Sequence, residues 1–149
     1  MKTGNIKGYS IRLVKKWPGK EIQALYQAAG WWDADDDPKM IPRTLQGSFA
    51  VAVAVEDATG KAVGMGRVIS DGVSDAYIQD VVVFHEHRGF GLGRRLVLTL
   101  ISVCRAHGIR WIALIAVPGS QEFYKGLGLQ VLPDFTPMRL PEASETPDK

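Results

Sequence analysis

The chain has 149 residues, which suits one domain with enough buried surface for a hydrophobic core. Its 18 basic and 16 acidic residues are interspersed and leave a formal net charge of +2, which argues against a basic face for nucleic acid. The single cysteine, Cys104, excludes an internal disulfide and a cysteine-based metal site, so we expect a cytoplasmic protein without metal. No apolar run approaches the roughly 18 residues of a membrane span, so we expect no membrane partner.

The N-terminal third predicts one strand followed by two helices. We expect a strand over 11–14 and, after Trp17-Pro18, a helix over 21–29, where apolar residues recur at intervals of three and four. A loop over 31–38 and a second short helix over 38–45 follow.

The middle of the chain predicts three consecutive strands. Apolar residues alternate with small ones over 48–56, which is typical of a strand packed on both faces. Turns at 57–60 and 71–72 then separate two further strands, 62–70 and 77–84. A helix over 92–106, a strand over 111–117, a short helix over 120–125 and a last strand over 135–140 complete the chain.

The segment between the third of these strands and the long helix is rich in glycine and arginine. Residues 84–95 read Phe-His-Glu-His-Arg-Gly-Phe-Gly-Leu-Gly-Arg-Arg. Glycine lets the backbone approach a ligand closely, and a helix N-terminus attracts anions. A dinucleotide fingerprint would need glycine in place of Arg94, and a P-loop would need a final Gly-Lys-Ser/Thr. The remaining pattern is R-x-x-G-x-G, carried by Arg88, Gly91 and Gly93.

This pattern resembles the acyl-CoA pyrophosphate loop of the GNAT superfamily of N-acetyltransferases. The resemblance implies an α/β (α+β) fold with a mixed, mostly antiparallel central sheet flanked by helices, in the order βααβββαβαβ. We expect residues 1–140 to form this single domain and residues 141–149 to be a disordered tail. The implied cofactor is acetyl-CoA, held by the end of the strand and by the loop through Val81, Val82, Val83, Arg88, Gly89, Phe90, Gly91, Leu92, Gly93 and Arg94.

A second segment extends the resemblance. Residues 120–129, Ser-Gln-Glu-Phe-Tyr-Lys-Gly-Leu-Gly-Leu, are similar to the family's A-x-x-F-Y-x-K-x-G-F pattern. The resemblance implies that Tyr124 is the general acid for the departing thiolate, with Ser120 and Phe123 beside the cofactor. A phenol whose pKa is about 10 stays protonated at neutral pH and can donate that proton.

The base that accepts the proton of the amine has two candidate forms. Asp80 is a carboxylate in an apolar strand, which is costly without a partner, so it is one candidate. Strand alternation puts Tyr77 and Gln79 on one face and Asp80 on the other. If the cofactor cleft opens on the face of Tyr77 and Gln79, these two residues line it and a water chain takes the proton. Asp80 is in that case a structural residue that holds several hydrogen bonds. Both alternatives stay open.

The acceptor is predicted to bind near Trp31, Trp32 and Asp33, because aromatic faces and carboxylates suit a cationic amine. A solvated acidic loop over one packed tryptophan is an equal alternative. Arg67 either holds a substrate carboxylate or pairs with Asp80.

These features predict an enzyme that moves an acetyl group from acetyl-CoA to the primary amine of a small molecule, by direct attack in a ternary complex. Two alternatives are a non-catalytic acyl-CoA sensor and an acetyltransferase acting on protein N-termini or lysines. The sequence leaves open whether two copies form a homodimer.

Overall fold

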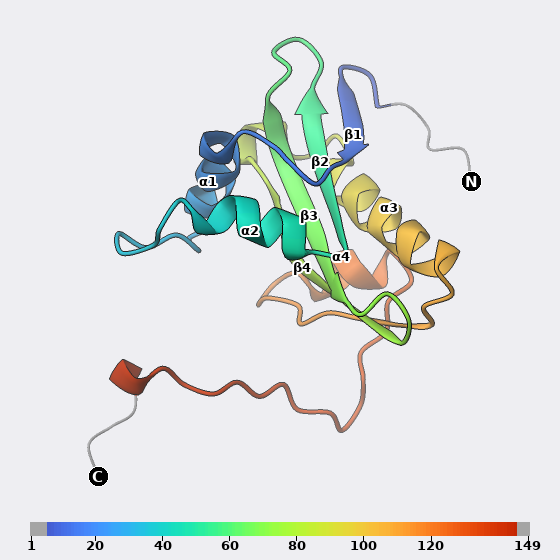
Figure 1. Ribbon diagram of the computed structural model, residues 1–149. Coiled ribbons are helices and arrows are strands. Elements are labelled where there is room, and N and C mark those ends of the chain that lie inside the picture. The colour runs from blue at the N-terminus through green and yellow to red at the C-terminus, as the bar shows by residue number, and fades with distance from the viewer. Residues whose placement is uncertain (1–5, 146–149) are drawn as a thin grey trace. The chain divides into compact units, whose positions relative to one another are not determined.

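The computed structural model describes residues 6–145, and these fall into two compact units, which divide between residues 114 and 115. The first unit contains most of the regular structure (Figure 1). In chain order its elements are β1 (Tyr9–Leu13), α1 (Gly19–Ala28), α2 (Met40–Gly47), β2 (Ala50–Glu56), β3 (Ala62–Ser70), β4 (Asp75–Val83), the 3-10 turn η1 (His85–His87), α3 (Leu92–Ala106) and β5 (Trp111–Ala113).

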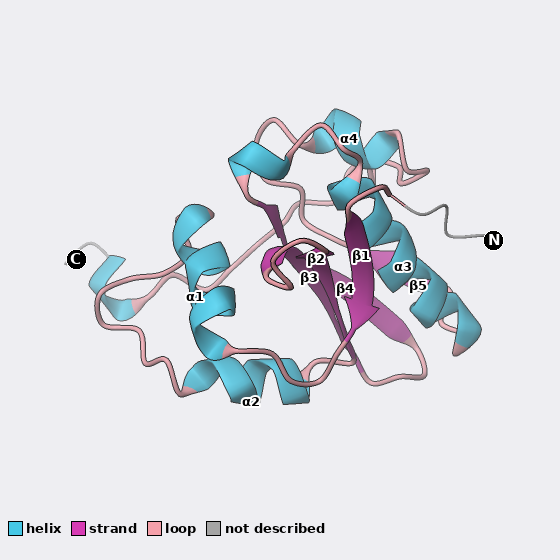
Figure 2. Cartoon of the chain, turned by 90° about the horizontal axis from the view of Figure 1, so that it is seen from above, coloured by secondary structure: helices cyan, strands magenta, loops and turns pink. Residues whose placement is uncertain are grey.

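The five strands form one sheet in the order β1-β2-β3-β4-β5. The first four strands pair antiparallel, and β5 pairs parallel to β4 after the crossover through α3. Helices α1 and α2 cover one face of this sheet and α3 covers the other, as Figures 1 and 2 show. The mixed, mostly antiparallel α+β architecture predicted from the sequence is therefore confirmed.

The alternation of β2 builds a core on both faces of the sheet. Its valines join the cluster under α1 and α2, together with Ile22, Leu25, Ile41, Leu45 and Met65. Its alanines face α3, and here Ala52 lies opposite Gly66 and Ala54 opposite Gly64. These four small residues let the leucines of α3 approach the strand backbone.

Gly64 is the tightest of these contacts. A Cβ atom at Gly64 would lie 3.0 Å from the carbonyl oxygen of Val82 and 3.3 Å from Leu96 Cδ1. We expect Gly64→Ala to destabilise the fold by about 1 to 3 kcal/mol, because the carbonyl belongs to the paired strand and cannot move freely. Urea unfolding measures the loss. Gly47→Ala is the matched control, since a Cβ there meets nothing within 4 Å and alanine favours the helix.

The second unit contains α4 (Gln121–Lys125) and a 3-10 turn, η2 (Ala143–Glu145). Two sequence predictions fail here. Strand β5 ends at Ala113 instead of 117, and residues 135–140 form no strand. Pro133, Pro137 and Pro141 flank and interrupt this last segment, and each removes a backbone donor that a strand needs. Of the predicted tail, residues 146–149 lie outside the described residues.

Candidate functional site

The end of β4 has an unusual pairing pattern. Its register with β3 shifts between Met65 and Arg67, so that Asp80 and Val81 both lie opposite Gly66. Asp80 has a left-handed backbone, with φ of 55°. This geometry is a β-bulge, in which one extra residue bends the strand and interrupts the ladder.

The bulge moves Asp80 onto the same face of the sheet as Gln79. Gln79 is directly opposite Arg67 on β3, and opposed residues share a face. The Asp80 carboxylate accepts hydrogen bonds from Arg67 and from Tyr26 of α1, which covers that face. The prediction that Asp80 lies on the other face of the sheet from Tyr77 and Gln79 is therefore wrong. The extra residue of the bulge interrupts the regular alternation of side chains between the two faces.

Beyond the bulge, β4 has a free edge. Strand β5 pairs with β4 only over Asp75–Tyr77, so no strand of the described residues pairs with Val81–Val83 on that side. The backbone groups of an unpaired strand edge can form a ladder with an extended ligand. The structure thus leaves one side of Val81–Val83, the end of the strand predicted to hold the cofactor, without a partner strand.

The glycine-rich loop continues directly from this edge. Gly89 and Gly91 have φ of 85° and 83°, and a Cβ at either position would meet nothing within 4 Å. Gly91 precedes the first turn of α3, where the backbone amides of Leu92 and Gly93 begin the helix. The first amides of a helix have no intrahelical acceptor and carry partial positive charge. The loop therefore fits an anion with room for its approach.

The other residues of the loop differ in their contacts and in their exposure. The Nε of Arg88 donates to the carbonyl oxygen of Val83 at 3.0 Å, which ties the loop to the end of β4. Phe90 is exposed, whereas Leu92 is buried in the core and can offer a ligand only its backbone. Arg94 lies in the first turn of α3.

A contact with β1 supports the loop, and sequence reasoning missed it. Tyr9 Oη lies 2.9 Å from His87 Nδ1, and the Tyr9 ring contacts the Phe90 ring with centroids 5.7 Å apart. Tyr9 is separated from His87 by 78 positions, and no local pattern pairs residues at that distance.

Asp80, Arg67 and Tyr26 form a compact polar cluster at the bulge. Arg67 forms an ion pair with Asp80, and the two side chains are 18% and 20% exposed. The Tyr26 hydroxyl donates to Asp80 Oδ2 at 2.8 Å. Burial, and then the negative charge of Asp80, raise the pKa of Tyr26 well above its usual value. Arg67 is also 3.4 Å from the hydroxyl of the buried Ser48. Of the two roles predicted for Arg67, the pairing with Asp80 is the one formed.

The two tryptophans predicted to bind the acceptor lie against this cluster. Their rings contact the Tyr26 ring, with centroid distances of 6.2 Å for Trp31 and 6.5 Å for Trp32. The Trp31 amide donates to the Tyr26 carbonyl oxygen at 2.9 Å, and the Trp31 side chain remains 40% exposed. The structure therefore brings Trp31 and Trp32 together with Arg67 and Asp80.

The acidic run after the tryptophans has mainly a local role. Asp36 accepts from the Asp33 amide at 2.7 Å, and Asp37 accepts from the Lys39 amide at 3.0 Å. Such side-chain bonds to nearby amides build turns. Within the described residues Asp33 forms hydrogen bonds only through its backbone amide and carbonyl groups, so its carboxylate remains free for a ligand.

Tyr77 and Gln79 line the same sheet face as Arg67. Tyr77 lies opposite Ile69, next to the Gln79–Arg67 pair, and is 44% exposed. Its partly exposed ring therefore adds an aromatic group to this face of the sheet.

In the second unit, Tyr124 is on α4 and half-buried. Burial raises the pKa of its phenol above the ordinary value of 10.0. Its ring contacts that of Phe123 with centroids 4.9 Å apart, and Ser120 Oγ donates to the Val117 carbonyl oxygen at 2.7 Å. The hydroxyl of Tyr124 is thus kept protonated, as a proton donor must be.

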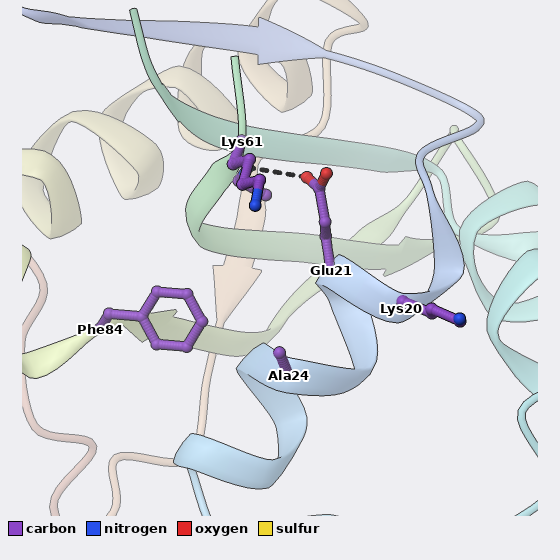
Figure 3. A pocket seen from close by; sticks show the side chains of 6 residues that line it. Lys20, Glu21, Ala24, Lys61 and Phe84 are labelled. Atoms are coloured by element: carbon purple, nitrogen blue, oxygen red, sulfur yellow. Dashed lines mark hydrogen bonds between the residues drawn. The ribbon is translucent and has the colours of Figure 1, made fainter. Parts of the chain in front are cut away.

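A pocket beside α1 is lined by none of the predicted site residues (Figure 3). Its volume is about 230 Å³, and its lining consists of Lys20, Glu21, Ala24, Lys61, Ala62 and Phe84. The Glu21 carboxylate accepts from the Ala62 amide at 2.9 Å and from Trp17 Nε1 at 2.7 Å. Because both bonds fix α1 to its surroundings, Glu21 has a structural role.

The sequence matches the family model described as the acetyltransferase (GNAT) family over residues 14–129. The chain belongs to the GNAT acetyltransferase family. Among its relatives is the uncharacterized N-acetyltransferase ycf52 of Pyropia yezoensis, 34% identical over 116 residues, which cover 76% of this chain and 66% of that protein. Serotonin N-acetyltransferase 2, chloroplastic, of Oryza sativa subsp. japonica is 37% identical over 81 residues, covering 54% of this chain and 40% of that protein. The chain thus spans less than two thirds of either relative.

Solved GNAT structures share the fold. A GNAT family acetyltransferase from Streptococcus pneumoniae TIGR4 has a TM-score of 0.73 at 22% identity, covering 91% of this chain and 98% of that one. Glucosamine-6-phosphate N-acetyltransferase from Arabidopsis thaliana has a TM-score of 0.69 at 19% identity, covering 89% and 99%. In GNAT enzymes acetyl-CoA is the acetyl donor, which supports the cofactor predicted from the loop.

Neither a membrane span nor a metal cluster occurs among the described residues. Within residues 6–145, no helix combines the length and apolar character of a membrane span. The same residues contain no group of three or more His, Cys, Asp or Glu side chains placed to hold a metal ion.

Proposed function

We propose that this GNAT protein transfers the acetyl group of acetyl-CoA to the primary amine of a small aromatic molecule that lacks a carboxylate. One observation carries the proposal. Strand β4 has a free edge leading into the glycine loop, and its bulge holds a carboxylate beneath an aromatic cluster. The same strand therefore offers places for both the donor and the acceptor.

The residues of the loop fit the cofactor. The open space at Gly89 and Gly91 gives a pyrophosphate access to the amides at the start of α3. The edge at Val81–Val83 offers backbone groups to the pantetheine arm. When bound, acetyl-CoA supplies an activated thioester. A backbone amide on this edge that polarises the thioester carbonyl contributes about 3 kcal/mol to the transition state.

Asp80 is the proposed proton acceptor. Its Oδ2 receives hydrogen bonds from Tyr26 and Arg67, whereas its Oδ1 receives none from the described residues. Oδ1 can therefore take a proton from the amine, directly or through an ordered water. Tyr124 is the proposed general acid, on the strength of its motif and its protonated phenol. If the amine attacks acetyl-CoA directly in a ternary complex, double-reciprocal plots of initial rate should intersect when acetyl-CoA and the amine are both varied. Parallel lines would contradict this mechanism.

The acceptor class follows from charge and ring chemistry. Trp31, Trp32 and Tyr77 provide partly exposed aromatic surface, and Asp33 and Asp80 provide negative charge for a cationic amine. Arg67 is already paired with Asp80, so it is not available to bind a substrate carboxylate. The relative from Oryza sativa that is named a serotonin N-acetyltransferase supports an aromatic amine.

The test is the release of free thiol from acetyl-CoA with paired amines. We expect kcat/KM for tryptamine to exceed that for tryptophan at least about tenfold, a difference of about 1.4 kcal/mol, because the carboxylate would compete with Asp80 for Arg67. Polyamines and a lysine peptide complete the panel. Equal rates for tryptamine and tryptophan contradict the acceptor class, and a preference for the peptide supports the protein-acetyltransferase alternative.

Location and assembly remain predictions. Relatives named chloroplastic occur in Oryza sativa and Arabidopsis thaliana, so the cytoplasmic setting expected from the sequence is untested. A homodimer also remains untested. Binding of acetyl-CoA without turnover of any amine would support the sensor alternative.

A further inference from the structure

Tyr26 lies between the two halves of the proposed acceptor site. It is on α1, which packs on the sheet face that carries Asp80 (Figure 1). Its hydroxyl bonds to Asp80, while its ring contacts both Trp31 and Trp32. The sequence pattern predicted Tyr26 only as part of the apolar face of a helix.

Asp80 needs external support to keep its orientation. Its backbone is left-handed, with φ of 55°, a conformation that residues other than glycine rarely adopt although aspartate tolerates it better than most. Two donors hold the carboxylate, the Arg67 guanidinium and the Tyr26 hydroxyl, and both bind Oδ2. Two donors on one oxygen fix the plane of the carboxylate and leave Oδ1 directed elsewhere.

The chemistry of the Tyr26 hydroxyl suits a permanent donor. Burial and the adjacent carboxylate raise its pKa, so the phenol is protonated throughout the range in which an enzyme of this kind would work. Its proton is already donated to Asp80 Oδ2, so the hydroxyl is not free to protonate another group. Its contribution is geometric, through Asp80.

We propose that Tyr26 is a positioning residue for acetyl transfer: its hydroxyl orients Asp80 so that Oδ1 meets the acceptor amine, while its ring supports the Trp31–Trp32 surface that binds the rest of the acceptor. The proposal rests on the proposed function. Tyr26 would thus link the group that binds the amine of the acceptor, Asp80, to the tryptophans that bind its ring.

The first test is Tyr26→Phe, which removes the hydroxyl and keeps the ring. We expect kcat with the best amine to fall about tenfold, because Oδ2 loses one of its two donors. The KM of the amine and the dissociation constant of acetyl-CoA should stay within about threefold, because the ring contacts with the tryptophans are retained. A fall confined to kcat identifies an interaction that matters in the transition state.

The second test asks whether Tyr26 acts through Asp80. In an Asp80→Asn background, which is itself expected to be slow, Tyr26→Phe should cause less than a twofold further loss of kcat. Such non-additivity is the signature of two residues acting as one unit. A full tenfold loss in that background would show that Tyr26 acts independently of Asp80 and would overturn the proposal.

The matched control is Ile22→Val, one turn earlier on α1 and fully buried. It weakens the packing of the same helix but removes none of the hydrogen bonds among Tyr26, Asp80 and Arg67, so kcat should be unchanged. A loss of kcat in this control equal to that of Tyr26→Phe would assign the effect to helix stability. Loss of the cooperative thermal transition in Tyr26→Phe would do the same.

The outcomes separate this inference from the proposed function. An active wild type with an unaffected Tyr26→Phe variant overturns the positioning role alone. A wild type that releases no thiol with any amine overturns the proposed function and this inference together.

Discussion

Tyr124→Phe is expected to lower kcat about 100-fold while the affinity for acetyl-CoA changes less than twofold. General acid catalysis contributes on the order of a hundredfold or more, and phenylalanine keeps the ring but cannot protonate a departing thiolate. The half-buried phenol has a raised pKa, so it is protonated across the whole pH range of the assay. Steady-state rates of thiol release, together with calorimetric titration of acetyl-CoA, measure the two quantities.

The comparison of kcat with affinity makes this result specific. A variant that loses affinity and kcat together would give Tyr124 a binding role. A loss of kcat below about threefold would mean that the thiolate obtains its proton from another donor and would contradict the general-acid assignment.

The second large effect is expected at Gly91. Its φ of 83° is a conformation that costs an alanine about 1 to 2 kcal/mol. In Gly91→Ala the free loop can relax out of this conformation, and binding must then restore it. We expect the dissociation constant of acetyl-CoA to rise at least about tenfold, which corresponds to about 1.4 kcal/mol.

Gly108→Ala controls for backbone strain. Gly108 lies just beyond the other end of α3, has φ of 79°, and, like Gly91, has nothing within 4 Å of an added Cβ. It should lose similar stability and bind acetyl-CoA within about twofold of the wild type. If both variants bind acetyl-CoA equally well, the loop is not the cofactor site.

Local patterns predicted most of the first unit correctly. The alternation over β2, the turns that separate β2, β3 and β4, and the three-and-four spacing of α3 are signals within a few residues. The glycine loop was also found, because Gly89 and Gly91 are conspicuous between a strand and a helix.

The cluster at the bulge could not be predicted in the same way. Strict alternation placed Asp80 on the wrong face, because a bulge depends on pairing with β3 and not on the β4 sequence alone. Tyr26 is 54 positions from Asp80, and its helical spacing is that of an ordinary core residue. Tyr9 and His87 likewise meet only through the sheet.

The second unit shows the opposite error. The apolar residues of 135–140 predicted a strand, but they are interrupted by proline and strongly exposed, with Phe135 and Leu140 at 68% and 93%. Apolar residues therefore predict a buried strand only where the backbone can form strand hydrogen bonds as well.

Thermal unfolding of the wild-type protein with and without acetyl-CoA tests most directly whether β4 and its loop form a cofactor site. At about one hundred times the dissociation constant, the ligand should stabilise the fold by roughly 2.7 kcal/mol. For a chain of this size that corresponds to about 5 to 10 °C in Tm. No shift at any acetyl-CoA concentration would contradict the proposed function at its foundation.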